Sequence, residues 1–237
     1  MGRPKRIALY GGTFDPVHAG HVEVARALCE LLALDEVLFI PAVVPPHKRG
    51  LRVTPALQRY AMLALATQGE PRLRISTVEL DEPAKPYTIE TLLRMQSRLG
   101  ARVSLFFVMG ADSWMEIRTW REWERVLSLV NHVVVTRPGY GVSTEHVTPA
   151  VRERIVDLRG LRQEEIRGVI ERSEGPKIYV TDAVVMDVSA TAIRELARAG
   201  RRLEVAGLVP PPVADFIEKY KLYREDILVN EPEQEED

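Results

Sequence analysis

The sequence predicts an α/β protein with a Rossmann-like, doubly wound parallel sheet that has helices on both faces. Two observations predict this class. Apolar segments rich in β-branched and aromatic residues alternate along the chain with amphipathic helical patterns. These segments are continuously apolar, which is typical of parallel strands buried on both faces. The chain has 237 residues, of which 46% are hydrophobic, enough for one large domain with a substantial core.

The predicted strands are the short apolar runs. In chain order they are Ile7–Tyr10, Val37–Ile40, Leu73–Val78, Val103–Met109, His132–Thr136 and Ile178–Thr181. Ligands of such sheets bind beyond the carboxyl ends of the strands, where the strand order changes direction. Polar residues that directly follow a predicted strand are therefore candidates for a site.

Helical patterns separate most of the predicted strands. The first helix is predicted from about Gly20 to Leu34. The second is predicted after Thr54, a candidate N-cap, with Pro55 at the first helical position. Two further helices are predicted over residues 88–98 and 120–129.

We expect one domain over residues 1–230. The stretch 143–176 is rich in charges of both signs, which predicts solvated helices rather than a nucleic-acid surface. Residues 231–237 read Glu-Pro-Glu-Gln-Glu-Glu-Asp and are predicted to be a disordered acidic tail.

Composition excludes several classes of function. A formal net charge of −2 gives no general attraction to nucleic acid or to a membrane surface. Cys29 is the only cysteine, so an internal disulfide is excluded, a cysteine-based zinc site is not expected, and we expect Cys29 to be packed. The apolar runs fall short of the ~18 residues that span a bilayer, and the run after the basic start is too short for a signal peptide. A cytoplasmic protein without nucleic-acid or membrane partners is expected.

The segment from Gly11 to His21, which reads Gly-Gly-Thr-Phe-Asp-Pro-Val-His-Ala-Gly-His, carries the strongest functional signal. Gly11 and Gly12 allow a bulky ligand to approach the backbone, and they suggest a glycine bend. His18 and His21 are three residues apart, so they share one face of the first helical turn. That turn also carries unpaired N–H groups and the positive end of the helix dipole. The segment therefore predicts a phosphate site.

A second helix start has the same character. Ser189 stands where an N-cap is expected, in the sequence Val-Ser-Ala-Thr-Ala-Ile-Arg. The hydroxyl groups of Ser189 and Thr191, the amides of the first turn and the guanidinium of Arg194 would form an anion site. A plain serine-capped helix explains Ser189 alone.

Two loops after predicted strands carry basic residues. The run Pro-Pro-His-Lys presents His47 and Lys48, and Lys48 is a candidate for contact with triphosphate oxygens as a point charge. Arg137 follows the strand 132–136 and would pair with a phosphate, although a structural ion pair is equally well supported.

The strand 103–109 is followed by Gly110 and Asp112. Gly110 permits close approach of a ligand, and Asp112 would accept hydrogen bonds from ribose hydroxyl groups or cap a helix. Thr88 is a candidate N-cap of the helix over residues 88–98. Of the three tryptophans, Trp114, Trp120 and Trp123, two are expected in the core.

These motifs together resemble the nucleotidyltransferase superfamily, whose (His/Thr)-x-Gly-His element binds nucleoside triphosphate phosphates. The motif Gly-Gly-Thr-Phe-Asp-Pro is similar to the corresponding motif of bacterial nicotinate-nucleotide adenylyltransferases. The resemblance extends over residues 6 to 224 and includes Pro-Pro-His-Lys, Tyr87-Thr88 with Thr91, Gly110-x-Asp112, Trp120, Arg137-Pro-Gly and the run from Val188 to Arg194. Residues 84–86 depart from the family's lead-in to Tyr87, and the stretch 143–176 is longer than in the family, which suggests an insertion.

The resemblance implies transfer of AMP from ATP to nicotinate mononucleotide, which gives deamido-NAD and pyrophosphate in NAD biosynthesis. It also implies a small C-terminal helical part, to which residues 209–213 and 217–223 contribute. His18 and His21 are the implied catalytic residues. The residues implied to bind ATP are Gly11, Gly12, Thr13, Phe14, Lys48, Ser189, Thr191 and Arg194. Those implied to bind the nicotinate nucleotide are Asp15, Thr88, Gly110, Asp112, Trp120, which would stack on the nicotinate ring, and Arg137.

Mg²⁺ is expected to be carried by the ATP phosphates and water, without a protein metal site, because it seldom uses an all-protein cage. Several alternatives stay open: an adenylyltransferase for nicotinamide mononucleotide or pantetheine phosphate, and an ATP-binding sensor without catalysis. An aminoacyl-tRNA synthetase core is disfavoured because the chain offers neither a lysine-rich mobile loop nor a tRNA-binding domain. A homo-oligomer is also compatible with the sequence.

Overall fold

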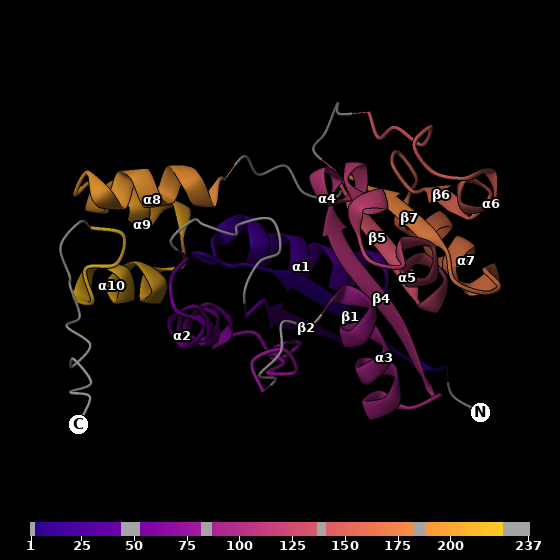
Figure 1. The fold of residues 1–237 in the computed structure, drawn as a ribbon, viewed down its shortest axis with the longest axis horizontal. Helices are drawn as coiled ribbons and strands as arrows, with labels where there is room; N and C mark the ends of the chain where they lie inside the picture. The colour runs from indigo at the N-terminus through magenta and orange to yellow at the C-terminus, as the bar shows by residue number, and fades with distance from the viewer. Residues whose placement is uncertain (1–2, 44–52, 82–86, 137–140, 183–187, 225–237) are drawn as a thin grey trace, which may run out of the picture.

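The computed structural model describes residues 3–43, 53–81, 87–136, 141–182 and 188–224. Within these ranges the strands are β1 Lys5–Gly12, β2 Glu36–Pro41, β3 Leu73–Ile75, β4 Val103–Gly110, β5 Asn131–Val135, β6 Ile155–Asp157 and β7 Ile178–Thr181. In the part of the chain that the structure describes, all seven pair in parallel in one sheet, in the order β3-β2-β1-β4-β5-β7-β6. The predicted fold class is thus confirmed (Figure 1).

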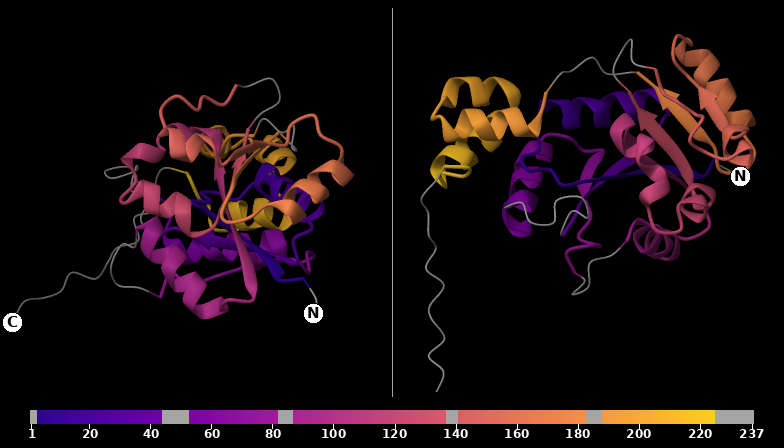
Figure 2. Two further views of the ribbon diagram at one scale, coloured as in Figure 1. Left: turned by 90° about the vertical axis from the view of Figure 1, so that its right-hand side faces the viewer. Right: turned by 45° about the horizontal axis from the view of Figure 1, so that its top comes forward.

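Helices connect and cover these strands. They are α1 Ala19–Leu31, α2 Ala56–Thr67, α3 Thr88–Leu99, α4 Ala111–Met115, α5 Trp123–Leu129, α6 Pro149–Arg152, α7 Gln163–Arg172, α8 Ala190–Arg198, α9 Arg202–Leu208 and α10 Pro211–Lys219. A short 3₁₀ helix spans Ile117–Thr119 between α4 and α5. Figure 2 shows α8, α9 and α10 grouped at the end of the molecule that lies away from α6 and α7, and α10 packs beside α2.

Both faces of the sheet are buried, as continuous apolar strands require. Ala8 of β1 belongs to a core with α1, α2, α7 and the C-terminal helices, whereas Ile7 and Leu9 belong to a second core with α3, α4 and α5. Phe106 and Phe107 of β4 divide in the same way. Cys29 is buried in the first core, as expected.

The strand order changes direction between β1 and β4, because the chain passes from β1 to β2 and β3 before it returns to β4. Neighbouring strands end in step at this edge: Gly12 pairs with Pro41 of β2, and Gly110 pairs with Val135 of β5. The carboxyl ends of β1 and β4 therefore form the switch point at which a ligand site is expected.

The charged stretch 143–176 is not purely helical, which corrects the sequence prediction. It contains α6 and α7, but β6 lies between them and pairs with β7 at the edge of the sheet. Ile155 and Val156 are partly buried, whereas Asp157 is exposed. A strand of three residues with such mixed burial is too short to leave an apolar run in the sequence.

Several helices and strands also begin or end at residues other than the predicted ones. The predicted strand over residues 73–78 ends at Ile75, and Val78 lies in a turn whose side chain joins the second core. The helix predicted to start at Trp120 begins at Trp123, because Glu122 adopts a left-handed backbone with φ of 52°. Pro55, rather than Thr54, is the N-cap of α2. The C-terminal helix ends at Lys219 rather than at residue 223.

Candidate active site

The loop that connects β1 to α1 lies at the switch point. Gly11 and Gly12 remain within β1, so the expected glycine bend is wrong. The chain turns instead at Phe14, whose φ is 50°. A Cβ on Gly12 would lie 2.8 Å from the Phe14 ring, so glycine at this position makes room for that ring. Phe14 itself is buried between Tyr10 and Phe39.

The two histidines of the loop form a stacked pair. His18 is the N-cap of α1 and His21 lies in its first turn, with ring centroids 3.7 Å apart. The backbone N–H of His18 donates a hydrogen bond of 3.2 Å to Nδ1 of His21. Since Nδ1 of His21 is an acceptor, the proton of the neutral ring must be on Nε2. His21 therefore offers a single oriented N–H donor.

Both imidazoles are neutral at physiological pH in the free protein. Burial lowers the pKa of His18 from its ordinary value to about 4. Burial and the neighbouring His18 together hold the pKa of His21 well below its ordinary value. An arriving phosphate would raise both pKa values because an anion favours the charged imidazolium.

The start of α8 lies beside this pair, although it is far away in the sequence. Ser189 is the N-cap of α8, as predicted, and its side chain is exposed. The Arg194 guanidinium donates from Nη1 to the carbonyl oxygen of Asp15 at 2.8 Å and from Nη2 to the Thr191 hydroxyl at 3.0 Å. A Cβ on Gly20 would stand 3.8 Å from Cβ of Val188. The two predicted anion sites are thus adjacent.

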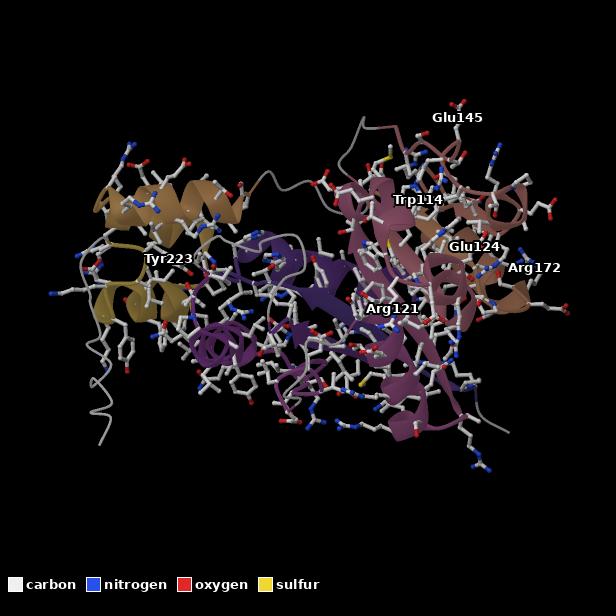
Figure 3. All side chains as sticks on the ribbon, viewed as in Figure 1. Trp114, Arg121, Glu124, Glu145, Arg172 and Tyr223 are labelled. Atoms are coloured by element: carbon white, nitrogen blue, oxygen red, sulfur yellow. The ribbon has the colours of Figure 1, made fainter. Side chains whose placement is uncertain are left out.

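Asp15 joins three segments of the chain within this region. Its residue surface is 3% exposed. Oδ2 accepts a hydrogen bond from the Thr54 N–H at 3.2 Å, and Oδ1 accepts one from the Tyr223 hydroxyl at 2.8 Å. Figure 3 labels Tyr223, which follows α10. The carboxylate is engaged within the protein, and its contact with the nicotinate nucleotide stays a prediction.

Trp120 lies on the other side of the end of β1. Its ring meets the Phe107 ring edge to face, with centroids 6.1 Å apart. The Phe107 ring in turn lies 3.4 Å from the position of a Cβ on Gly11. Nε1 of Trp120 is buried and has no hydrogen-bond partner among the described residues. Trp114 is fully buried, whereas Trp120 and Trp123 pack half-buried against the same core.

The start of α3 lies beside the segment that contains Trp120 and Arg121. Tyr87 is the N-cap and Thr88 is the first helical residue, so the predicted cap is displaced by one position. The Arg121 guanidinium lies 4.9 Å from the centroid of the Tyr87 ring and pairs with Glu90 at 3.4 Å. Figure 3 shows Arg121 between α3 and α5. At the end of β4, Gly110 is the N-cap of α4 and Asp112 is exposed in its first turn.

Three predicted basic residues, His47, Lys48 and Arg137, lie outside the described residues. In the described ranges, no group of three or more histidine, cysteine, aspartate or glutamate side chains is placed to hold a metal ion. None of the helices described is long and apolar enough to cross a membrane.

Sequence reasoning missed Arg59, a fully buried guanidinium on α2 that contacts the β1 loop. An arginine is ordinarily read as a surface residue. Its position three and four residues before the buried Met62 and Leu63 places it on the inner face of the helix. That spacing is the signal that would have indicated its burial.

The sequence profile of the cytidylyltransferase-like family matches residues 9–196. A protein of Thermoanaerobacter sp. is 36% identical over 226 residues, which cover 95% of this chain and 98% of its own length. A protein of Thermus thermophilus is 38% identical over 219 residues, which cover 92% of this chain and 100% of its own. Both carry the name "probable nicotinate-nucleotide adenylyltransferase".

Among solved structures, the Plasmodium falciparum nicotinic acid mononucleotide adenylyltransferase complexed with NaAD has the same fold. The TM-score is 0.67 at 19% sequence identity, and the superposition covers 92% of this chain and 97% of that one. At this identity the likeness concerns the arrangement of strands and helices.

Proposed function

The chain belongs to the nicotinate-nucleotide adenylyltransferase family, within the cytidylyltransferase-like proteins, and on this premise we propose that it transfers AMP from ATP to nicotinate mononucleotide. The products are deamido-NAD and pyrophosphate, so the reaction belongs to NAD biosynthesis. We place it in the cytoplasm, with ATP and nicotinate mononucleotide as the partners.

One observation carries the proposal at the level of the site. The starts of α1 and α8 lie side by side at the carboxyl edge of the sheet, and Arg194 connects them through Asp15. Each helix start supplies free backbone N–H groups and a positive dipole end. Two such starts that face one ligand suit a polyanion such as a triphosphate.

The chemistry is a displacement at the α-phosphorus of ATP. A phosphate oxygen of the mononucleotide forms the new P–O bond, and the bond between the α-phosphorus and the oxygen bridging to the β-phosphate breaks. The electron pair of that bond leaves with pyrophosphate. Because the nucleophile is already an anion, no side-chain base is required, and catalysis consists of positioning and charge stabilisation.

His18 and His21 act in this proposal as hydrogen-bond donors to the transferring phosphate and the triphosphate. The hydrogen bond from the His18 N–H to Nδ1 of His21 fixes the donor on Nε2 of His21 before substrate arrives. A donor that is oriented in advance needs no reorganisation as charge develops, which is the basis of electrostatic catalysis.

The leaving pyrophosphate would be neutralised from the second helix start. Ser189, Thr191 and Arg194 are assigned to the β- and γ-phosphates, together with Lys48, which lies outside the described residues. Gly11, Gly12, Thr13 and Phe14 form the backbone next to the triphosphate. Mg²⁺, carried by the phosphates and water, would supply further charge neutralisation.

The mononucleotide is assigned to the neighbouring side of the site. Trp120 offers a half-buried indole whose face suits offset stacking on a pyridine ring. Thr88, Gly110 and Asp112 border the same region, and Arg137 and Asp15 complete the proposed set.

A pyrophosphate-release assay tests the proposed function. The protein is incubated with ATP, Mg²⁺ and nicotinate mononucleotide, nicotinamide mononucleotide or pantetheine phosphate in turn. We expect the highest kcat/KM with nicotinate mononucleotide. Equal or higher kcat/KM with another acceptor would overturn the substrate assignment, and ATP binding without pyrophosphate release would indicate a sensor.

His21→Ala tests the assigned mechanism in the same assay. Loss of an oriented donor to a developing charge is expected to reduce kcat by about 10²- to 10³-fold. Arg26→Ala serves as the control, because Arg26 is exposed on the same helix and pairs with Glu23 and Glu70. Unchanged kcat in His21→Ala would contradict the role.

A further inference from the structure

Arg59 occupies an unusual position for a charged residue. It lies in the first turns of α2 and has 0% exposed surface. A buried guanidinium is costly unless its N–H groups are satisfied. None of the salt bridges found among the described residues involves Arg59, so the side chain is held by other means.

Four backbone carbonyl groups satisfy the guanidinium. Nη1 donates to the Thr13 oxygen at 2.7 Å, and Nε donates to the Thr54 oxygen at 2.8 Å. Nη2 donates to the oxygens of Ala42 at 2.7 Å and Val43 at 3.2 Å. One side chain therefore joins the loop after β1, the end of β2 and the start of α2.

The same three segments are also joined to each other. The Ala42 N–H donates to the Gly12 oxygen at 2.9 Å, and the Thr54 N–H donates to the Asp15 carboxylate at 3.2 Å. Residue Thr54 thus donates its N–H to Asp15 and accepts from Arg59 on its carbonyl oxygen. Asp15 interacts favourably with the Arg59 guanidinium through its charge, and Thr54 forms a hydrogen bond with each of the two side chains.

The loop after β1 contains a strained residue, which the hydrogen bonds of Arg59 help to hold in place. Phe14 follows Thr13 directly and adopts a left-handed backbone with φ of 50°. This conformation costs about 1 kcal/mol or more for a residue with a bulky side chain. Arg59 fixes the peptide oxygen that precedes this turn, and the turn leads directly to the His18–His21 pair.

We propose that Arg59 is a positioning residue for ATP: its planar fork fixes the loop after β1 against the end of β2, and so sets the backbone on which the triphosphate is bound. The inference deepens the proposed function and rests on it for the identity of the triphosphate. Arg59 is not a catalytic residue, because it is fully buried and makes four hydrogen bonds to backbone carbonyl oxygens.

The geometry predicts which substrate is affected. Arg59 donates directly to the carbonyl group of Thr13, which is assigned to ATP. Among the described residues, its hydrogen bonds reach Asp15, which is assigned to the mononucleotide, only through Thr54. Trp120, on the assigned mononucleotide side, packs against the opposite core with Phe107, and Thr88 directly precedes Ile89 of that core. A defect in positioning should therefore appear mainly in the KM for ATP, whereas general destabilisation would affect both substrates alike.

Arg59→Lys is the decisive variant. Lysine keeps the charge and the apolar stem, but its point-like ammonium cannot reproduce the fork across three segments. We expect the KM for ATP to rise about 10-fold, as for the loss of a charged hydrogen bond, with the KM for nicotinate mononucleotide changed less than about 2-fold. Arg59→Met, which also removes the charge, should raise the KM for ATP further.

Arg154→Lys is the matched control. Arg154 is a half-buried arginine that also donates to carbonyl oxygens, to that of Pro176 at 2.9 Å and to that of Leu127. It differs in position, because it directly precedes β6, the last strand in the sheet order and distant from β1 and β2. We expect this variant to lower the melting temperature while both KM values stay at the wild-type level. All variants are assayed below the lowest melting temperature found.

Failure of this proposal can be distinguished from failure of the proposed function, because pyrophosphate release by the wild-type protein is measured first and tests the activity alone. The proposal is overturned if Arg59→Lys leaves the KM for ATP unchanged, or if both KM values rise equally. It is also overturned if Arg154→Lys shows the same split, since the effect would then follow from destabilisation alone. Should Arg59→Met fail to fold, Arg59→Lys still decides the question.

Discussion

The His18–His21 pair illustrates how local chemistry follows from a few contacts. The rings stack at 3.7 Å between centroids, so two positive charges at this distance would repel each other strongly. The fold keeps both rings neutral by burying them, and the His18 N–H selects the tautomer of His21. The pair therefore suits donation to phosphate rather than acid–base transfer at neutral pH.

The depressed pKa of His18 can be measured directly. We expect its imidazole to titrate near pH 4 in the free protein, observed by NMR of the ring carbons. Because the folded-state pKa lies below the unfolded value of about 6.5, the unfolded state binds protons first. Stability should then fall as the pH is lowered from about 6.5 toward 4. A midpoint close to 6.5 would show that the ring is solvated, contrary to the geometry.

The positions of some functional residues can be predicted from the sequence, whereas the partners of others cannot. His18, His21 and Ser189 stand in a periodic context at helix starts, and the structure finds them at or within those starts. Arg59 and Tyr223 have partners distant in sequence, and a lone arginine or tyrosine carries no pattern that indicates those partners. Long-range hydrogen bonds therefore could not be predicted from this one sequence.

At the scale of elements, the longer strands and helices were predictable because their apolar patterns are continuous. The errors fall on short elements and on starts. β6 has three residues, and the start of α5 depends on the left-handed Glu122, for which no glycine or asparagine gives a signal. The roles of residues 47, 48 and 137 stay predictions, since these residues lie outside the described ranges.

Glu79 offers a test of the packing beside α3. Burial raises the pKa of Glu79 to about 7, and the Thr91 hydroxyl donates to its carboxylate at 2.8 Å. Since the folded pKa lies above the unfolded value, wild-type stability is lost as the pH rises through 7. Glu79→Gln keeps an acceptor for Thr91 and carries no charge.

We therefore expect the melting temperature of Glu79→Gln, relative to that of wild type, to be higher at pH 8.5 than at pH 5.5. Thermal unfolding at the two pH values measures the difference. Glu145→Gln serves as the control because Glu145 is exposed (Figure 3). A difference between Glu79→Gln and wild type that does not change with pH would contradict the buried, protonated state of Glu79 below pH 7.

On the scale of the whole molecule, the site is assembled from two parts. The sheet supplies the ends of β1 and β4, and the C-terminal helices supply the start of α8. Asp15 holds them together, because it accepts hydrogen bonds from Arg194 on its carbonyl group and from Tyr223 on its carboxylate. The packing of α10 beside α2 supports the same arrangement.

Tyr223→Phe tests this connection. The change removes the donor to a buried carboxylate, which should cost about 1.5–3 kcal/mol of the free energy of unfolding. We also expect the KM for ATP to rise, because the segment after α10 loses its hydrogen bond to the β1 loop, and the C-terminal helices include α8. Tyr220→Phe is the matched control, since Tyr220 is exposed on the same segment. Equal effects of the two variants would argue against the connection.

A cavity lies at the amino ends of the strands, opposite the carboxyl ends that carry the histidine pair. It has a volume of about 770 Å³ and is lined in part by Arg6, Ser104, Asn131 and Tyr179. These residues lie at the amino ends of their strands, away from the histidine pair. Because the triphosphate is assigned to the carboxyl ends of the strands, a nucleotide bound in this cavity instead would contradict the assignment.

A crystal structure of the protein with a non-hydrolysable ATP analogue and Mg²⁺ tests the central claim most directly. We expect density for the triphosphate between the starts of α1 and α8, within hydrogen-bond distance of Nε2 of His21 and of the Ser189 and Thr191 hydroxyl groups. Triphosphate density in the cavity at the amino edge, or anywhere without contact to His21 and the start of α8, would contradict it.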